Sequence, residues 1–257
     1  MDILHVLLLS VIQGLTEFLP VSSSGHLVIF QKLFRLEEPP VLFDILVHVG
    51  TLGAIVFYFK KQLLAIFKGV IKKNRSDINI LSMILIVTIP AGIIGFFLQG
   101  YIKDIFDSLK LVGLSLLLTA GLLFSTKFTK NLNKDFKHLN WKEALFIGIF
   151  QAIAILPGVS RSGSTIVAGL WQNLKEETAF AFSFYLAIPA ILGALILQIP
   201  EMSNTSGYYL KQGIFGMIIA GIVGYFALTL LERVIKSTKL FRFGFYCFAL
   251  GVLILLV

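Results

Sequence analysis

The sequence predicts an all-α, polytopic membrane protein with six transmembrane helices and two re-entrant helix-loop-helix hairpins, arranged as an inverted-topology repeat. Hydrophobic residues make up 57% of the 257 positions and charged residues only 14%, and the mean hydropathy is +0.89. Apolar runs recur along the whole chain, and a short polar stretch near the start is repeated near the middle. We therefore expect one transmembrane domain over residues 1–257, without a separate soluble domain.

The repeated stretch is residues 13–27, which align with residues 151–165 without a gap. The identical positions are Gln13/Gln151, Val21/Val159, Ser22/Ser160, Ser24/Ser162 and Gly25/Gly163. Both copies contain a proline followed by serine- and glycine-rich chain, which interrupts a helix. Lipid does not tolerate such a break unless it lines an internal site. Broken helices at corresponding positions of two halves indicate a binding site near the middle of the membrane.

Each copy of the repeat is expected to form a hairpin of two short helices. The first hairpin comprises residues 4–18 and 25–34, and the second comprises residues 143–156 and 162–171. None of these helices reaches the about 20 residues that a membrane span needs. The first pair is therefore expected to enter the membrane and return on the same side, with a single kinked span as the alternative.

Six further apolar runs are expected to cross the membrane. They are residues 41–59, 78–98, 109–124, 178–198, 214–231 and 240–257. Because a hairpin adds no crossing and three spans add an odd number, repeat 2 (about 141–257) is expected to be inverted relative to repeat 1 (about 1–125).

The basic residues are used to orient the chain. They lie mainly in predicted loops between apolar runs, such as residues 60–77 and 126–142. The inverted arrangement places roughly sixteen Lys/Arg on one side, expected to be the cytoplasm, and about five on the other. Both termini are then expected to lie outside.

The net charge of +8 does not indicate nucleic-acid binding, since the positive-inside rule already accounts for it. The single cysteine, Cys247, lies in an apolar run, which excludes a disulfide framework or a cysteine metal cluster within the chain. Membrane lipids are the expected surroundings. Whether the protein forms a homodimer stays open.

The two breaks carry the residues of an expected anion site. Each break leads into a helix N-terminus, whose free N–H groups and partial positive charge favour anions. Arg161 adds a guanidinium, whose shape suits two phosphate oxygens at once. Phosphate or diphosphate is therefore the expected ligand. The phosphate-binding candidates are Ser22, Ser24, Gly25, Ser160, Ser162, Gly163 and Thr165.

Catalytic and metal-binding candidates lie beside these residues. The Glu17 carboxylate would repel a phosphate unless a divalent cation lies between them, and Gln13, one helical turn away, offers a second oxygen ligand. His26 lies three residues after Ser23 and can act as base for a hydroxyl nucleophile or as acid for the leaving group. The catalytic candidates are Glu17, Ser23, His26 and Arg161. The nucleophile stays open between Ser23, His26 and a metal-bound water, and the set favours phosphoryl transfer over transport.

A further pair, Asp44 and His48, has i,i+4 spacing on the next span. We expect these two side chains to pair with one another through a hydrogen bond, with a supporting role at the site as the alternative.

Two motifs carry a resemblance to a known family. Residues 13–17, Gln-Gly-Leu-Thr-Glu, are similar to a (Glu/Gln)-x-x-x-Glu motif, and residues 157–165 are similar to a Pro-Gly-x-Ser-Arg-Ser-x-x-Thr motif. Both motifs are those of the bacitracin-resistance type undecaprenyl pyrophosphate phosphatases, which the chain resembles over essentially its whole length. The resemblance implies a multi-pass enzyme of the bacterial plasma membrane. This enzyme hydrolyses undecaprenyl diphosphate to undecaprenyl phosphate and inorganic phosphate, which recycles the lipid carrier for cell-wall synthesis.

The resemblance also implies which residues act. The catalytic positions of the family correspond to Glu17, Ser23, His26, Ser160, Arg161 and Thr165. It further implies a need for a divalent cation such as Mg²⁺ or Ca²⁺. Gln13 takes the amide form of the first acidic position, which leaves a metal site one charge poorer.

Two rival interpretations are weighed against this one. A transporter or flippase of polyprenyl phosphate would use the same site, because inverted repeats with broken helices are a transporter arrangement. A second class of membrane phosphatase has Pro-Ser-Gly-His and Ser-Arg motifs, which residues 23–26 and 160–161 resemble in part. That class needs a histidine nucleophile further along the chain, and no histidine follows Arg161.

Overall fold

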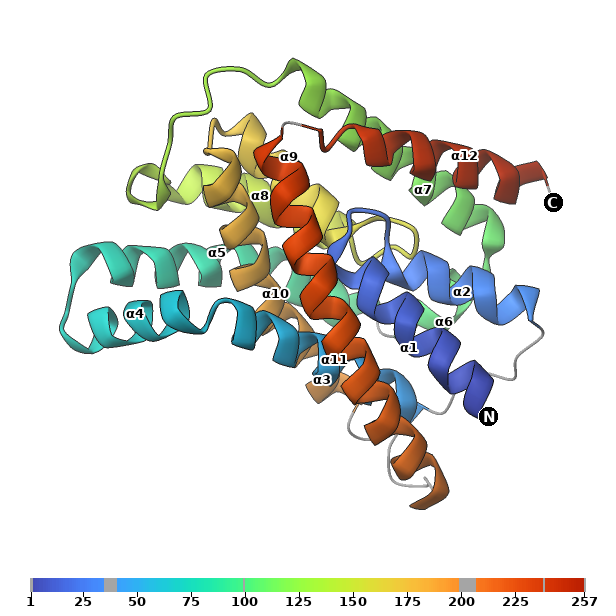
Figure 1. Ribbon diagram of the computed structural model, residues 1–257. Helices are drawn as coiled ribbons and strands as arrows, with labels where there is room; N and C mark the ends of the chain where they lie inside the picture. Colours follow the sequence, from blue (N-terminus) through green and yellow to red (C-terminus); the bar gives the residue numbers. More distant parts are fainter. Residues whose placement is uncertain (1, 35–40, 99, 199–206, 238, 257) are drawn as a thin grey trace.

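The computed structural model describes residues 2–34, 41–98, 100–198, 207–237 and 239–256, and the part that it describes is helical apart from loops and one isolated bridge (Figure 1). The helices are α1 (Ile3–Phe18), α2 (Ser23–Leu33), α3 (Val41–Tyr58), α4 (Lys60–Ile71), α5 (Arg75–Leu98), α6 (Ile102–Asp107), α7 (Leu109–Ser125), α8 (Trp141–Ile153), α9 (Arg161–Trp171), α10 (Glu176–Gln198), α11 (Gly207–Lys236) and α12 (Arg242–Leu256). Short 3-10 turns at Thr126–Phe128 and Phe136–His138 lie between α7 and α8. The all-α prediction is confirmed for these residues.

Several helices have the length and composition of membrane spans. Within the described ranges, four helices (α5, α7 with its 3-10 extension, α10 and α11) qualify, and the bent pair α3 and α4 would make a fifth. The helices α1 and α12 are apolar but shorter. Large apolar side chains such as Phe97 and Phe226 are exposed, at 73% and 67%, which suits a lipid surrounding. The chain is therefore a polytopic helical membrane protein.

Residues 60–71 differ from the prediction, because they form helix α4 and not a loop. This helix turns by 74° from α3 and buries none of its residues. Lys60, Lys61 and Lys68 share it with the exposed side chains of Leu64 and Phe67. Leucine, alanine and isoleucine at helical spacing favour this helix, and mixed lysine and apolar exposure is typical of a helix that lies at a membrane surface.

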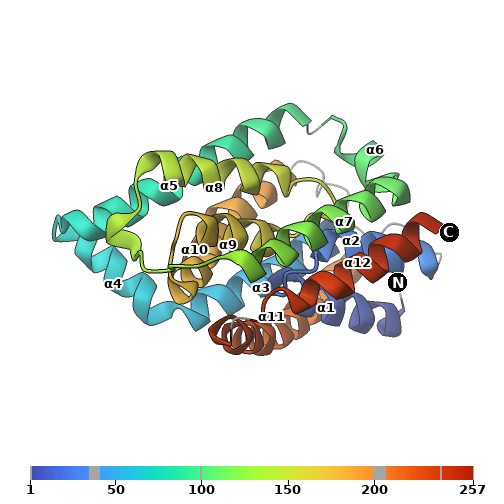
Figure 2. The same cartoon turned by 90° about the horizontal axis from the view of Figure 1, so that it is seen from above.

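The two halves of the chain pack into each other. Figures 1 and 2 show α3 against α11, α7 against α12 and α5 against α8, and α1 also packs along α11. Close approach between these helices uses small residues. At Gly50 of α3, for example, an added Cβ would lie 2.1 Å from the main-chain oxygen of Met217 in α11.

The two connections between short helices meet inside this packing. Residues 19–22 join α1 to α2, and residues 154–160 join α8 to α9. Figure 1 shows both connections in the middle of the fold. They are in contact, since the Gly158 N–H donates a hydrogen bond to Ser22 Oγ at 3.1 Å. The fold thus brings the two copies of the repeated stretch to one place.

Candidate active site

Glu17, at the end of α1, is the centre of a hydrogen-bonded cluster. Its Oε1 accepts a hydrogen bond from Arg161 Nη2 at 2.7 Å. Its Oε2 accepts from Ser23 Oγ at 2.8 Å and from Gln13 Nε2 at 3.1 Å. The cluster is largely shielded from solvent, because the side chains of Glu17 and Arg161 are 8% and 15% exposed. The structure therefore brings together four of the residues that the sequence singled out.

Arg161 is the first residue of α9 and is oriented by α10. Its Nη1 donates to the main-chain oxygen of Ser183 at 3.3 Å. Its guanidinium carbon lies 6.0 Å from the centre of the Phe184 ring, within reach of a cation–π interaction. One side of the guanidinium therefore faces Glu17 while another is held by α10. A guanidinium has several N–H donors in a planar fork, so donors remain for an anion.

Ser22 and Ser160 cap the two helices that begin at the breaks. Ser22 Oγ accepts from the Gly25 N–H at 3.2 Å, and Ser160 Oγ accepts from the Gly163 N–H at 3.1 Å. Both side-chain contacts are N-caps, which serine commonly provides, although the backbone differs, with φ of 72° at Ser22 and −76° at Ser160. Both serines are buried, with 3% and 2% exposure. Their hydroxyls are thus already used to define where α2 and α9 begin.

Glycine is required where the two connections touch. Gly158 has φ of 95°, a backbone conformation that residues with a side chain rarely adopt. An added Cβ there would lie 2.5 Å from the main-chain oxygen of Val112. A Cβ at Gly25 would lie 2.9 Å from the Cα of Gly158. The helix N-termini can approach each other only because both positions lack a side chain.

The other phosphate-binding candidates lie around these caps. Ser24 is half-buried at the start of α2, and Ser162 is 1% exposed at the start of α9. Thr165 lies one turn further into α9, where its hydroxyl is 2.7 Å from Ser183 Oγ and donates to the main-chain oxygen of Arg161 at 2.9 Å. Thr165 therefore fastens α9 to α10 behind Arg161.

His26 is buried in α2 but does not join the Glu17 cluster. Its Nδ1 lies 2.7 Å from the main-chain oxygen of Ser22, and its Nε2 lies 2.7 Å from the hydroxyl of Tyr246. Within the described residues, no hydrogen bond links His26 to Ser23. Tyr246 belongs to α12, and the sequence analysis did not find it because 220 positions separate it from His26.

His48 lies beside the Glu17 cluster, a supporting position that was expected only as the alternative. Its Nε2 approaches Glu17 Oε2 at 3.9 Å. Its Nδ1 donates to the main-chain oxygen of Asp44 at 2.7 Å. The expected pairing of the two side chains is not formed, and Asp44 Oδ1 has no hydrogen-bond partner among the described residues. The i,i+4 spacing was a usable signal, but it did not indicate which nitrogen would face Glu17.

The donors around Glu17 bear on the expected divalent cation. Gln13 Oε1 is buried and has no hydrogen-bond partner in the described part of the chain, so an oxygen ligand is free beside the carboxylate. No cluster of three or more His, Cys, Asp or Glu with metal-binding geometry occurs within the described ranges. One carboxylate and one amide oxygen suit Mg²⁺ or Ca²⁺ when phosphate and water supply the other ligands. The oxygen types of these two side chains are therefore those that such a cation takes.

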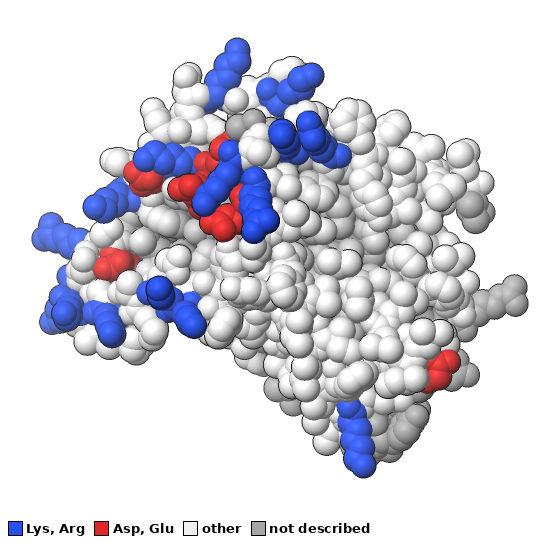
Figure 3. Space-filling view, in the orientation of Figure 1, with Lys and Arg blue, Asp and Glu red and all other residues white. Residues whose placement is uncertain are grey.

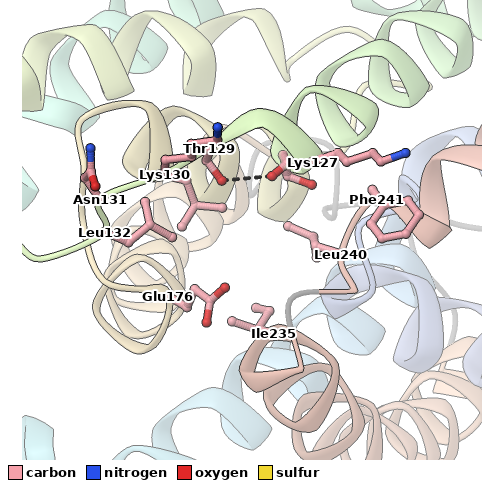
Figure 4. Close-up of a pocket in the computed structure, with 11 residues that line it drawn as sticks. Lys127, Thr129, Lys130, Asn131, Leu132, Glu176, Ile235, Leu240 and Phe241 are labelled. Carbon is pink, nitrogen blue, oxygen red and sulfur yellow. Dashed lines mark hydrogen bonds between the residues drawn. The ribbon is translucent and has the colours of Figure 1, made fainter.

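A separate pocket of about 450 Å³ lies between the end of α7, the start of α10 and the α11–α12 connection (Figure 4). Figure 4 shows Glu176 and Leu240 on opposite parts of its wall, with Lys127 and Lys130 above. None of the residues of the Glu17 cluster lines this pocket. It is therefore not part of the candidate site.

The fold and the cluster define a polytopic membrane protein with a shielded polar site at the meeting point of two broken helix pairs. Comparison with known proteins identifies the family. Residues 6–253 match the family model described as "Bacitracin resistance protein BacA", and the chain belongs to this family. The resemblance seen in the two motifs is thus confirmed.

Curated relatives agree with this assignment. The undecaprenyl-diphosphatase of Desulforapulum autotrophicum is 38% identical, covering 98% of this chain and 97% of the relative. The proteins of the same name from Desulfatibacillum aliphaticivorans and Treponema denticola are each 40% identical, covering 98% of this chain and 97% and 96% of the relatives. The similarity therefore extends over both halves of the fold.

Proposed function

We propose that this protein is an undecaprenyl-diphosphatase of the bacterial plasma membrane. It hydrolyses undecaprenyl diphosphate to undecaprenyl phosphate and inorganic phosphate, which recycles the lipid carrier of cell-wall synthesis and gives resistance to bacitracin. Family membership and the names of the relatives support the reaction. In the structure, the contact between Glu17 and Arg161 carries the proposal, because it joins the two breaks into one site. No observation favours the transporter alternative.

Substrate binding is assigned to the α9 side of the site. Arg161 binds the diphosphate with the N–H donors that Glu17 and Ser183 leave free. The N-termini of α2 and α9 add backbone N–H groups and partial positive charge. Ser24 and Ser162 are assigned as further phosphate ligands near these termini, where their hydroxyls lie 3.3 Å from Ser22 Oγ and 3.2 Å from Ser160 Oγ. The prenyl chain extends into the surrounding lipid, which is the natural environment for it.

Bond breaking is assigned to Ser23 and Glu17. Ser23 Oγ donates to Glu17 Oε2 at 2.8 Å, which is the distance between a hydroxyl nucleophile and its base. Ser23 Oγ attacks the terminal phosphorus, Glu17 accepts the hydroxyl proton, and the bond to the bridging oxygen breaks to release undecaprenyl phosphate. Water then cleaves the phosphoserine and returns the proton to Ser23. The departing phosphate monoester leaves as an anion and needs no proton in this step, and His26 is assigned to support the site from α2.

Glu17 and Gln13 are proposed to hold the divalent cation. Their fit rests on the unpaired Gln13 Oε1 beside the carboxylate. When bound, Mg²⁺ or Ca²⁺ supplies positive charge that offsets the charge of the diphosphate. In this proposal α1 carries both the cation ligands and the base, and α9 carries the arginine that binds the diphosphate.

The proposed topology has six spans and two re-entrant hairpins in an inverted repeat, with both termini outside. Four observations support it. The packing of α1 on α11 has its counterpart in α8 on α5, and both N-cap serines accept from the N–H three residues further on. Figure 1 shows both termini at the end of the molecule away from α4. Figure 3 shows most Lys and Arg gathered on the α4 side and around the top, which fits a cytoplasmic face.

The test is phosphate release in detergent, where transport has no meaning. Purified full-length protein is incubated with a polyprenyl diphosphate and Mg²⁺ or Ca²⁺, and inorganic phosphate is measured over time. We expect turnover by the wild type and none by Glu17→Ala. A folded wild type that releases no phosphate under any of these conditions would overturn the proposed function and favour transport.

A further inference from the structure

His26 is held at both ring nitrogens, and the nature of the two partners decides its protonation. Nδ1 lies 2.7 Å from the main-chain oxygen of Ser22, which can only accept a hydrogen bond, so Nδ1 carries a proton. In the neutral imidazole Nε2 is then the acceptor. The Tyr246 hydroxyl, 2.7 Å from Nε2, is its donor.

We propose that Tyr246 is the positioning residue of His26. Ser22 sets the tautomer, and Tyr246 orients the ring through Nε2, to which its hydroxyl donates. Tyr246 contacts His26 through both its hydroxyl and its ring. The two rings are stacked, with centroids 5.6 Å apart and planes 11° apart. This inference rests on the proposed function only for the role of His26 in hydrolysis.

The burial of the pair supports this role. His26 is 3% exposed, whereas Tyr246 is 48% exposed. A histidine that is buried inside a short helix has no water shell to hold its basic nitrogen in a fixed direction. The Tyr246 hydroxyl takes over this task, and its half-exposed ring lies between the buried histidine and the outside of the helix bundle.

The position of Tyr246 is itself fixed by the packing of α12. The adjacent Cys247 is fully buried, and its Sγ donates to the main-chain oxygen of Pro20 at 3.6 Å. One turn earlier on the same side of α12, an added Cβ at Gly244 would lie 2.8 Å from the Phe124 ring of α7. Helix α12 is therefore anchored to the first break and to α7. The last helix of the chain thus supplies a group to the first hairpin.

The hydroxyl and the ring of Tyr246 can be separated by Tyr246→Phe, which keeps the stacking and removes the hydrogen bond. The matched control is Tyr101→Phe, which removes a hydroxyl from an exposed tyrosine at the start of α6. We expect kcat of Tyr246→Phe to fall by about tenfold, with KM within about twofold of the wild type. Tyr101→Phe should match the wild type. If Tyr246→Phe has the kinetics of the control, the proposal is wrong.

A second kinetic comparison asks whether Tyr246 acts through His26. In a His26→Gln background, Tyr246→Phe should cause no further loss, because the group that it orients is gone. An equal loss in both backgrounds would assign Tyr246 a role independent of His26 and overturn the proposal.

A spectroscopic measurement does not depend on hydrolysis. The full-length protein with ¹⁵N-labelled histidine has only four histidines, and His26→Gln assigns the signals of His26. We expect the Nε2 resonance of Tyr246→Phe to move toward that of an imidazole nitrogen without a donor, while the Nδ1 resonance stays. If the Nε2 resonance of the wild type already lies where an imidazole nitrogen without a hydrogen-bond donor does, the contact with Tyr246 is not formed and the proposal is wrong. If the proposed function fails instead, phosphate release is absent from the wild type while this signature persists.

Discussion

Glu17 on α1 and Arg161 on α9 form an ion pair at 2.7 Å, although 144 positions separate them in the chain. A shielded ion pair is weak evidence for stability, because the loss of hydration offsets much of the attraction. Its place at the ends of two broken helices, next to Ser23 and Gln13, is better explained by the binding of a charged ligand. The predictions below test this explanation.

The shape of the Arg161 side chain should matter as well as its charge. Arg161→Lys keeps the positive charge but removes the planar fork, and a lysine cannot donate to Glu17 and two phosphate oxygens in the same geometry. We expect kcat/KM for phosphate release to fall by at least about 100-fold, which is about 2.7 kcal/mol. Arg75→Lys, at an exposed position at the start of α5, is the control and should match the wild type. A variant Arg161→Lys with near wild-type turnover would remove bidentate binding from the mechanism.

Ser23→Ala distinguishes a nucleophile from a helper. If Ser23 Oγ attacks phosphorus, kcat should fall by at least about 1000-fold, or about 4 kcal/mol, in a protein that still folds. The control is Ser237→Ala, which removes an exposed hydroxyl just after the end of α11. A loss of only about tenfold, or about 1.4 kcal/mol, is too small for a missing nucleophile and would leave His26 or water in that role.

Gln13→Glu should strengthen divalent-cation dependence. A second carboxylate beside Glu17 adds negative charge to the proposed metal ligands, and carboxylate count is a main determinant of affinity for Mg²⁺ and Ca²⁺. We expect a lower Mg²⁺ concentration at half-maximal phosphate release and a larger rise in unfolding temperature on addition of Ca²⁺. Gln62→Glu, exposed on α4, makes the same change away from the site. Identical cation responses in the two variants would exclude Gln13 as a ligand.

Gly158→Ala should loosen the contact between the two breaks. The alanine would have φ near 95° and a Cβ within 2.5 Å of the Val112 oxygen. Such backbone strain costs about 1 to 3 kcal/mol. We expect a lower unfolding temperature in detergent together with reduced phosphate release. Gly121→Ala is the matched control, since its Cβ would meet nothing within 4 Å. Equal unfolding temperatures for the two variants would contradict the requirement for glycine.

Cysteine labelling can test the orientation of the chain. In a Cys247→Ala background, Asp2→Cys and Asn131→Cys each place a single thiol at an exposed position. A membrane-impermeant maleimide added to intact cells should label Asp2→Cys, while Asn131→Cys should react only after the cells are opened. Labelling of Asn131→Cys in intact cells would contradict the proposed topology.

Much of the helical structure could be predicted because helix limits depend on local pattern. The run predicted at residues 178–198 is α10, Glu176–Gln198, and the short helix predicted at 162–171 is α9, Arg161–Trp171. The error at residues 60–71 arose because lysines were interpreted as a loop. Their helical spacing on α4 allows them to remain exposed while the chain stays helical.

The sequence by itself determined the membrane class, the family and the two breaks with the residues that meet there, because composition, motifs and interruptions of an apolar run are local properties. Only the tertiary structure decided which atoms are in contact. It placed Ser23 against Glu17, and it turned His26 toward Tyr246 and His48 toward Glu17. Such contacts depend on the angle and depth at which distant helices pack, and no spacing along the chain encodes these directly.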